Sequence, residues 1–220
     1  MRRPSPESLA ELVVRAHALC GHTLGEVAAG LGVPVPSVRR SAKGFAGQLL
    51  ELALGAAADA GDGPDFPALG VELKTIPLGA RGQPIESTFV CAVSMAEAGR
   101  EEWATSRLRR RLAHVLFVPL SSARLGTPGE RRIGQARLWQ PSPNEEALLR
   151  ADWEDLMGAI GAGHAEELRA ERGAALQVRP KAASARVRTV GIMPDGAGRV
   201  APLGFYLRAR FTAQLLAARS

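Results

Sequence analysis

The stretch Asp65-Phe-Pro-Ala-Leu-Gly-Val-Glu72-Leu-Lys74-Thr-Ile-Pro77 joins a turn containing Pro and Gly to the start of a β-strand. Residues two apart on a strand face the same side of it, so we expect Glu72 and Lys74 to project together. Asp65 comes from the preceding turn, where the chain can fold its carboxylate towards Glu72. Two carboxylates beside one lysine are the groups needed to hold a divalent cation and to cleave a phosphodiester.

Lysine is rare in this chain, which has 3 lysines against 25 arginines. An ammonium group can release its proton near a reaction, whereas a guanidinium group cannot. We therefore expect Lys74 to orient the attacking water or to stabilise the charge on the transition-state oxygens. Magnesium takes oxygen ligands in near-octahedral geometry, so we expect Asp65, Glu72 and the Leu73 carbonyl to supply the protein ligands of Mg²⁺.

The acid-x-Lys pattern has a second interpretation, which is a solvated strand face carrying a neighbouring Glu–Lys pair. The chain has 22 acidic residues in 220, so a chance acid-x-Lys match is common. On these residues alone, both interpretations stay open.

Positive charge is concentrated in two regions of the chain, separated by an acidic one. Residues 173–220 hold eight basic residues against the single acid Asp195, and residues 101–140 hold eight arginines against three glutamates. Residues 141–172 hold eight acids against three arginines. With a net charge of +6, this distribution favours a polyanion such as double-stranded DNA as the partner.

The composition is that of a globular protein, with 46% hydrophobic and 23% charged residues. The sequence has no apolar run long enough to span a membrane, and Met1-Arg-Arg-Pro leads into a charged helix rather than a secretory signal. Cys20 and Cys91 fall in apolar contexts, which favours reduced thiols in the core over a disulfide. We expect a cytoplasmic protein with no membrane partner.

Hydrophobic periodicity predicts helices flanking a small mixed sheet, an α/β or α+β fold. We expect helices at 5–19, 45–58, 105–113 and 142–172, a short helix that opens with the capping box at Thr23, and a last helix through Leu216. We expect strands at 71–76, 87–93, 114–119, 132–139, 176–180 and 205–210. We expect one domain with a helical part (1–60), a catalytic sheet core (61–140), an acidic helical stretch (141–172) and a DNA-reading part (173–220). Gly191–Gly198 is expected to form a mobile loop.

The motifs of this chain closely resemble the MutH family, the strand-nicking endonucleases of methyl-directed mismatch repair. The resemblance covers nearly the whole chain in order. It begins with Lys43-Gly-Phe-Ala-Gly-Gln-Leu-Leu-Glu51 and the Asp65–Pro77 stretch, and continues through Glu86-Ser-Thr-Phe-Val-Cys91, Trp103-Ala-Thr-Ser106, Arg131-Arg-Ile-Gly134, Leu176-Gln-Val-Arg-Pro-Lys-Ala182 and Gly204-Phe-Tyr-Leu207.

The resemblance implies a restriction-endonuclease-like fold in two lobes around a DNA-binding cleft. It also implies magnesium-dependent nicking of the unmethylated strand at hemimethylated GATC, with activation by an ATP-dependent, MutL-like partner. Asp65 and Glu72 become metal ligands, Lys74 becomes the catalytic ammonium, and Glu51 becomes a further acid lining the metal site.

The same resemblance assigns DNA contacts to residues outside the Asp65–Pro77 stretch. Arg179 resembles the guanine reader, and a bidentate arginine suits guanine O6 and N7. Tyr206, the one tyrosine, resembles the residue that senses adenine methylation. Further DNA contacts are expected at Lys43, Gly44, Phe89, Arg111, Pro180 and Lys181. Arg111 departs from the family, which tends to have a lysine there; a guanidinium can still bind phosphate but cannot lose a proton.

Two other functions compete with this one. Residues 23–40 have the look of a helix-turn-helix, which would make the protein a DNA-binding regulator, although Pro36 disfavours helical geometry at Val35. A restriction endonuclease cutting both strands would use the same catalytic residues but generally needs a two-fold pair of active sites. The sequence shows no self-complementary hydrophobic face, so we expect a monomer.

Overall fold

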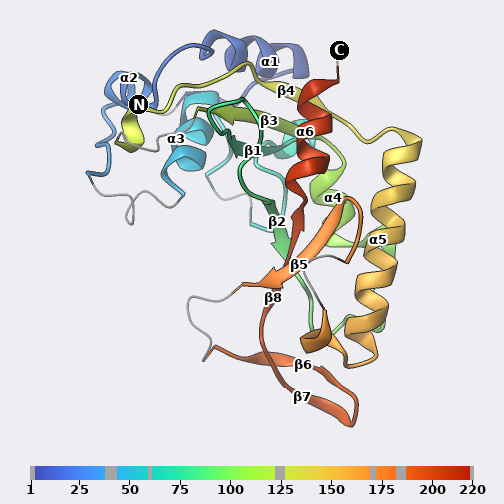
Figure 1. The fold of residues 1–220 in the computed structure, drawn as a ribbon. Coiled ribbons are helices and arrows are strands. Elements are labelled where there is room, and N and C mark those ends of the chain that lie inside the picture. Colours follow the sequence, from blue (N-terminus) through green and yellow to red (C-terminus); the bar gives the residue numbers. More distant parts are fainter. Residues whose placement is uncertain are drawn as a thin grey trace. The chain divides into compact units, whose positions relative to one another are not determined.

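The computed structural model describes residues 3–37, 44–58, 61–121, 127–168, 172–181 and 187–218. The expected mixed α/β fold is confirmed, and Figure 1 shows its helices and short strands. The chain divides into two compact units, each built from two separate stretches. The first unit contains Met1–Ile85 and Ala113–Gln140, and the second contains Glu86–Leu112 and Pro141–Ser220.

The first unit is organised around a three-stranded sheet. Its strand order is β1-β3-β4, with β1 (Glu72–Pro77) parallel to β3 (Val115–Leu120) and β3 antiparallel to β4 (Arg137–Trp139). Every residue of β3 is buried, as expected of a strand that is paired on both sides. Along β1, buried Leu73 joins the main hydrophobic core, while Glu72 and Lys74 alternate to the other face.

Three helices supply much of that core, namely α1 (Leu9–Ala18), α2 (Leu24–Leu31) and α3 (Phe45–Leu54). The capping box predicted at Thr23 is confirmed, because the Thr23 hydroxyl accepts from the Glu26 N–H and the Glu26 carboxylate accepts from the Thr23 N–H. The prediction that the first helix begins at Ser5 is wrong. Ser8 caps it instead, by accepting from the Glu11 N–H. Two 3₁₀ turns, η2 (Pro67–Leu69) and η4 (Pro128–Glu130), complete the unit.

The second unit contains an antiparallel sheet of strand order β2-β8-β5. Its strands are β2 (Thr88–Ala92), β5 (Leu176–Pro180) and β8 (Leu203–Leu207), and its helices are η3 (Trp103–Thr105), α4 (Arg107–Leu112), α5 (Pro143–Gly161), η5 (Ala165–Glu167) and α6 (Ala209–Ala217). Helix α5 contacts β5, and a capping box at Ser142 begins it at the predicted residue. It ends at Gly161, eleven residues before the predicted end at 172.

The expectation of a mobile loop at Gly191–Gly198 is wrong. Strands β6 (Thr189–Met193) and β7 (Gly196–Val200) pair there as an antiparallel hairpin, drawn below β8 in Figure 1. Small residues permit this close pairing, since a Cβ at Gly198 would meet the side chain of Met193 and one at Gly191 would meet that of Val200. Glycines usually indicate a loop, and that is why the sequence was misleading here. In this hairpin their role is to let the two strands pack closely.

The two cysteines differ from each other in exposure. Cys91 is buried as predicted, but Cys20 is exposed because it follows the last turn of α1, and neither forms a disulfide. In the described part of the chain, no helix is long and apolar enough to cross a membrane.

Candidate functional site

A tight loop brings Asp65 next to β1. Phe66 and Val71 exchange backbone hydrogen bonds of 2.9 and 3.2 Å, so the chain between them closes as a small ring. Gly70 closes the ring with a φ of 66°, a conformation that favours glycine. In this antiparallel pairing, Asp65 lies opposite Glu72, so two acidic residues seven apart in the sequence become neighbours in the backbone.

The Asp65 carboxylate lies along the edge of β1 that faces away from β3. Glu72 donates its N–H to the His114 carbonyl on the β3 side, whereas Leu73 donates its N–H to Asp65 Oδ2 at 2.8 Å. The N–H and C=O of one strand residue point the same way, so the Leu73 carbonyl also faces this edge. Asp65 and the Leu73 carbonyl, two of the predicted metal ligands, therefore share one edge of the strand.

Glu72 and Lys74 form a buried ion pair on the sheet face opposite the main core. Lys74 Nζ donates to Glu72 Oε1 at 2.6 Å, and the side chains are only 14% and 3% exposed. The alternative interpretation of this pair as a solvated strand face is therefore wrong. Taking a carboxylate and an ammonium out of water costs free energy, so a buried ion pair need not stabilise the fold. Such pairs are therefore candidates for a functional role.

The remaining predicted members of this site differ in how the structure places them. Glu51 is half-buried on α3, a helix that contacts β1. Gly44 directly precedes α3 with a φ of 83° and is exposed. Lys43 lies outside the described residues.

The oxygen groups at β1 suit magnesium in kind. Magnesium retains several waters and needs only one or two protein carboxylates, and Asp65 and Glu72 supply two carboxylates beside a backbone carbonyl. No cluster of three or more His, Cys, Asp or Glu side chains with metal-ligand geometry occurs in the described ranges. A metal bound here would be held by these two carboxylates and the Leu73 carbonyl.

In the second unit, four predicted DNA-contacting residues meet on one face of the β2-β8-β5 sheet. Phe89 and Tyr206 pack edge to face with their ring centroids 5.3 Å apart. The Arg179 guanidinium lies 5.9 Å from the centroid of the Tyr206 ring, and Lys181 Nζ lies 3.5 Å from that of Phe89. Two cations over two aromatic rings form a surface suited to stacking and to binding phosphate or base edges.

Gly204 makes this cluster possible. It pairs with Arg179 in the ladder and lies on the same face as Tyr206, two residues away. A Cβ at Gly204 would come within 2.9 Å of Phe89 Cε2 and 3.4 Å of Lys181 Cβ. Phe89 and Lys181 can therefore cross over β8 only because this position lacks a side chain.

We predict that Gly204→Ala lowers the free energy of unfolding by about 1–3 kcal/mol, because the ring of Phe89 must move away. Gly158→Ala, on the exposed face of α5 in the same unit, is the matched control, since nothing lies within 4 Å of its added Cβ. The control is expected to gain about 0.5–1 kcal/mol from helix propensity. Urea unfolding of both variants measures the difference; equal effects would show that Gly204 is not constrained by Phe89.

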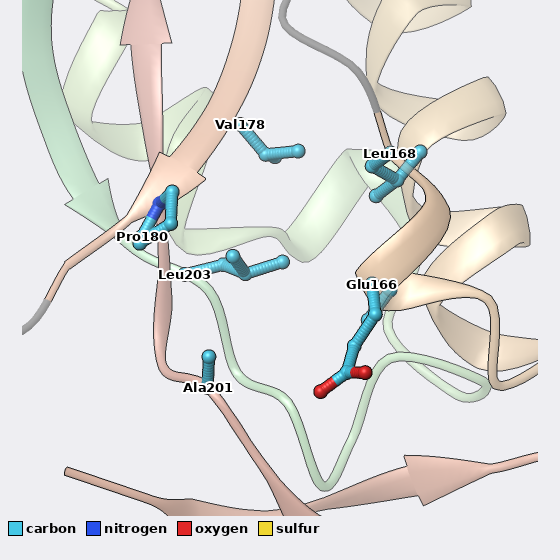
Figure 2. A pocket seen from close by; sticks show the side chains of 7 residues that line it. Glu166, Leu168, Val178, Pro180, Ala201 and Leu203 are labelled. Carbon is cyan, nitrogen blue, oxygen red and sulfur yellow. The ribbon is translucent and has the colours of Figure 1, made fainter. Parts of the chain in front are cut away.

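The opposite face of the same sheet borders a small cavity. It has a volume of about 230 Å³ and is lined by Ala165, Glu166, Leu168, Val178, Pro180, Ala201 and Leu203. Figure 2 shows Glu166 reaching in from η5, opposite Ala201. Pro180, a predicted DNA contact, lies on this face rather than beside Arg179, because neighbouring strand residues alternate.

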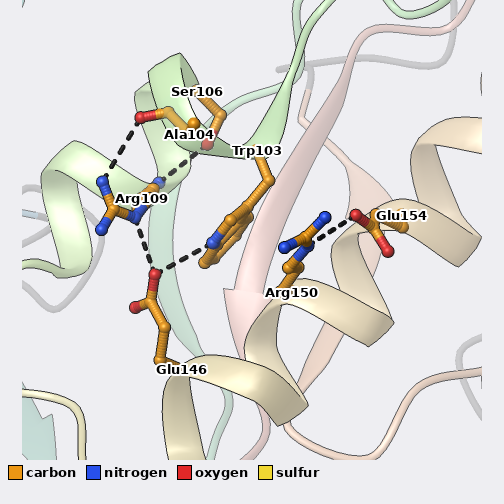
Figure 3. Close-up of polar contacts among 7 residues, drawn as sticks. All are labelled: Trp103, Ala104, Ser106, Arg109, Glu146, Arg150 and Glu154. Atoms are coloured by element: carbon orange, nitrogen blue, oxygen red, sulfur yellow. Dashed lines mark hydrogen bonds and ion pairs between the residues drawn. The ribbon is translucent and has the colours of Figure 1, made fainter. Parts of the chain in front are cut away.

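Helix α4, which carries Arg111, is fixed to α5 by a polar network (Figure 3). Arg109 Nε and Trp103 Nε1 both donate to Glu146 Oε1, at 2.7 and 2.9 Å. The Ser106 hydroxyl accepts from the Arg109 N–H at the start of the helix. Arg109 therefore helps to hold α4 against α5, and Arg111, two residues further along α4, is half-buried.

Two polar residues near the second site were missed by sequence reasoning. Asp152, buried in α5, accepts backbone N–H bonds from Ala174, Ala175 and Leu176. Gln177 is 2% exposed within β5 and donates to the Ser87 hydroxyl. A polar residue inside an otherwise apolar strand or helix stripe was the signal available in the sequence.

Comparisons with known proteins place the chain beside DNA mismatch repair proteins. A model of the family described as DNA mismatch repair enzyme MutH matches residues 54–152, which include β1. The DNA mismatch repair protein MutH of Shewanella amazonensis is 46% identical over 212 residues, covering 96% of this chain and 95% of the relative. That of Serratia proteamaculans is 44% identical over 215 residues, covering 97% and 94%.

Proposed function

The chain belongs to the MutH family of DNA mismatch repair enzymes, and on that premise we propose that it is a magnesium-dependent endonuclease that nicks the unmethylated strand at hemimethylated GATC sites. The observation that carries the proposal is the group at β1. Asp65 bonds to the backbone of Leu73, and Glu72 and Lys74 form a buried pair beside it. This is a carboxylate–lysine group suited to phosphodiester hydrolysis.

The chemistry divides between the metal and the side chains around it. Magnesium held by Asp65, Glu72 and the Leu73 carbonyl would lower the pKa of an attacking water and neutralise charge on the phosphate. The Lys74 ammonium, already directed towards Glu72, donates hydrogen bonds to the attacking water or to the oxygens on which charge develops. Glu51 would add negative charge at the α3 side of the site.

Site selection is assigned to the aromatic and cationic cluster of the second unit. Arg179 would read guanine in the major groove, and Tyr206 would contact the adenine whose methylation is sensed. Phe89, Lys181, Pro180, Arg111 and the segment at Lys43 and Gly44 would hold the surrounding duplex. The exposure of Arg179 and Lys181 leaves both cations accessible to a polyanion.

We further propose that the protein works as a cytoplasmic monomer that is activated by a MutL-like ATPase. The competing regulator hypothesis is not favoured by the fold, because residues 33–37 after α2 contain no helix; residues 38–43 lie outside the described range. A regulator would also have no use for the buried Glu72–Lys74 pair.

The deciding experiment is cleavage of a supercoiled plasmid carrying one hemimethylated GATC site, in the presence of magnesium. Wild-type protein is expected to give nicked circles, while Glu72→Ala protein and a fully methylated plasmid give none. Linear plasmid would instead identify an enzyme that cuts both strands. Tight DNA binding without cleavage, even with a MutL-like activator added, would argue against the endonuclease.

We predict that Arg179→Ala reduces the preference for the specific site by about 1–3 kcal/mol, or about fivefold to 150-fold, because one bidentate guanine contact is lost. Binding to a random duplex should change much less. Competition binding with specific and random DNA measures both quantities. An equal loss on the two DNAs would make Arg179 a phosphate contact that positions the duplex without reading it.

A further inference from the structure

Gln177 is a buried amide on the face of the sheet that carries Tyr206. The two residues are Cα partners in the β5–β8 ladder, so their side chains project to the same side. Gln177 is only 2% exposed, and its Nε2 donates to the hydroxyl of Ser87. A buried amide is costly unless it is hydrogen-bonded, so this bond accounts for tolerance of a polar residue here.

The Gln177–Ser87 bond crosses the central strand of the sheet. Gln177 lies on β5, whereas Ser87 directly precedes β2, and β8 runs between these two strands. Neighbouring strands are about 4.8 Å apart, so the side chains must together cover about 10 Å. Thr88 pairs with Leu207, which places the crossing beside Tyr206, towards the end of β8. Asparagine, one methylene shorter, cannot complete the same crossing.

Three groups therefore lie around Tyr206 on this face of the sheet. Phe89 packs edge to face at 5.3 Å, the Arg179 guanidinium lies 5.9 Å from the ring centroid, and the Gln177–Ser87 crossing lies next along the strand. The ring remains half-exposed on its outer side. The Gln177–Ser87 bond, by contrast, links β5 to the residue that precedes β2, so it belongs to the sheet itself.

We propose that Gln177 is a positioning residue, whose bond to Ser87 fixes the orientation of the Tyr206 ring and thereby sets discrimination at the base that Tyr206 contacts. The part of this inference that concerns discrimination rests on the proposed function; the part that concerns ring orientation does not. A side chain that only filled space here could be apolar, whereas a buried hydrogen bond between Gln177 and Ser87 favours one arrangement of the strands around Tyr206.

The orientation is tested directly because Tyr206 is the single tyrosine of the sequence. Protein labelled with 3-fluorotyrosine gives ¹⁹F NMR signals from this ring alone. Gln177→Asn and Ser87→Ala are each expected to shift or broaden the wild-type signal, and Ser87→Thr, which keeps the hydroxyl, should restore it. Thr212→Val is the matched control. Thr212 lies on α6 in the same unit, and its buried hydroxyl donates to the Arg208 carbonyl. Removing this hydroxyl should leave the ¹⁹F signal unchanged.

The consequence is tested by the ratio of kcat/KM for unmethylated and methylated GATC duplexes. Gln177→Asn and Ser87→Ala are expected to lower this ratio at least about tenfold, which corresponds to about 1.4 kcal/mol, with Ser87→Thr and Thr212→Val near the wild-type ratio. A uniform loss on both duplexes with an unchanged ¹⁹F signal would overturn the proposal and leave only a structural bond. If the wild type does not discriminate, the proposed function fails, while the ¹⁹F signals still decide whether the crossing positions the ring.

Discussion

Replacing Lys74 by alanine is expected to slow DNA cleavage about a thousandfold or more, while DNA affinity stays within a few-fold of wild type. The reason is the placement of the ammonium, which lies 2.6 Å from Glu72 and is only 14% exposed. Removing one donor that stabilises charge in a transition state costs about a hundredfold to a thousandfold, and loss of water orientation adds to it. Single-turnover cleavage at saturating protein measures the chemical step apart from binding.

This substitution also leaves a buried carboxylate without its cation, which destabilises proteins by about 3–5 kcal/mol. The folded fraction must therefore be measured by circular dichroism under the assay conditions. Lys74→Arg is the matched control, since it keeps the positive charge beside Glu72 but cannot release a proton. A folded Lys74→Arg protein that does not cleave would show that the ammonium itself is needed. Near-normal cleavage by Lys74→Ala would remove Lys74 from the mechanism.

Replacing Asp152 by alanine is expected to lower the free energy of unfolding by about 3–5 kcal/mol, one of the largest losses at any position outside the active site. Its carboxylate accepts the backbone N–H groups of Ala174, Ala175 and Leu176 at 2.6–2.9 Å. All three donors would be left without that acceptor at the start of β5, the strand that carries Arg179. Urea unfolding measures the loss, and Asp152→Asn should lose less because it retains one oxygen acceptor.

Asp155 lies one turn away on the same helix and provides the control. The hydrogen bond from Arg172 holds the pKa of Asp155 below its usual range, so this pair contributes stability above the unfolded pKa and loses it as the pH falls through the lower folded pKa. Because the pair is solvent-exposed, Asp155→Asn at pH 7 is expected to cost less than about 1 kcal/mol. Equal losses at positions 152 and 155 would show that the buried amides are satisfied without Asp152.

Hydrophobic periodicity and capping motifs predicted most elements of the fold, because the residues that they mark as apolar are the ones buried in the structure. The capping boxes at Thr23 and Ser142 set helix starts through contacts only three residues long. The strand at 176–180 was predicted with its observed bounds. The predictions failed where short-range signals are ambiguous. Ser5 and Ser8 were equally suitable caps for the first helix, and the structure uses Ser8. At Gly191–Gly198, glycines that suggest a loop instead allow two strands to pair closely.

The sequence alone determined the chemical groups of this protein and the family to which it belongs. Three of its properties can be taken from the linear sequence: the scarcity of lysine, the two-residue spacing of Glu72 and Lys74, and the order of the motifs. Tertiary structure alone decided which groups meet. Only the Phe66–Val71 ring lays Asp65 along the edge of β1, and only the β2-β8-β5 pairing brings Phe89, Arg179 and Tyr206 to one face. The physical reason is that strand pairing depends on register between segments far apart in sequence, and a shift of one residue would turn every side chain to the other face.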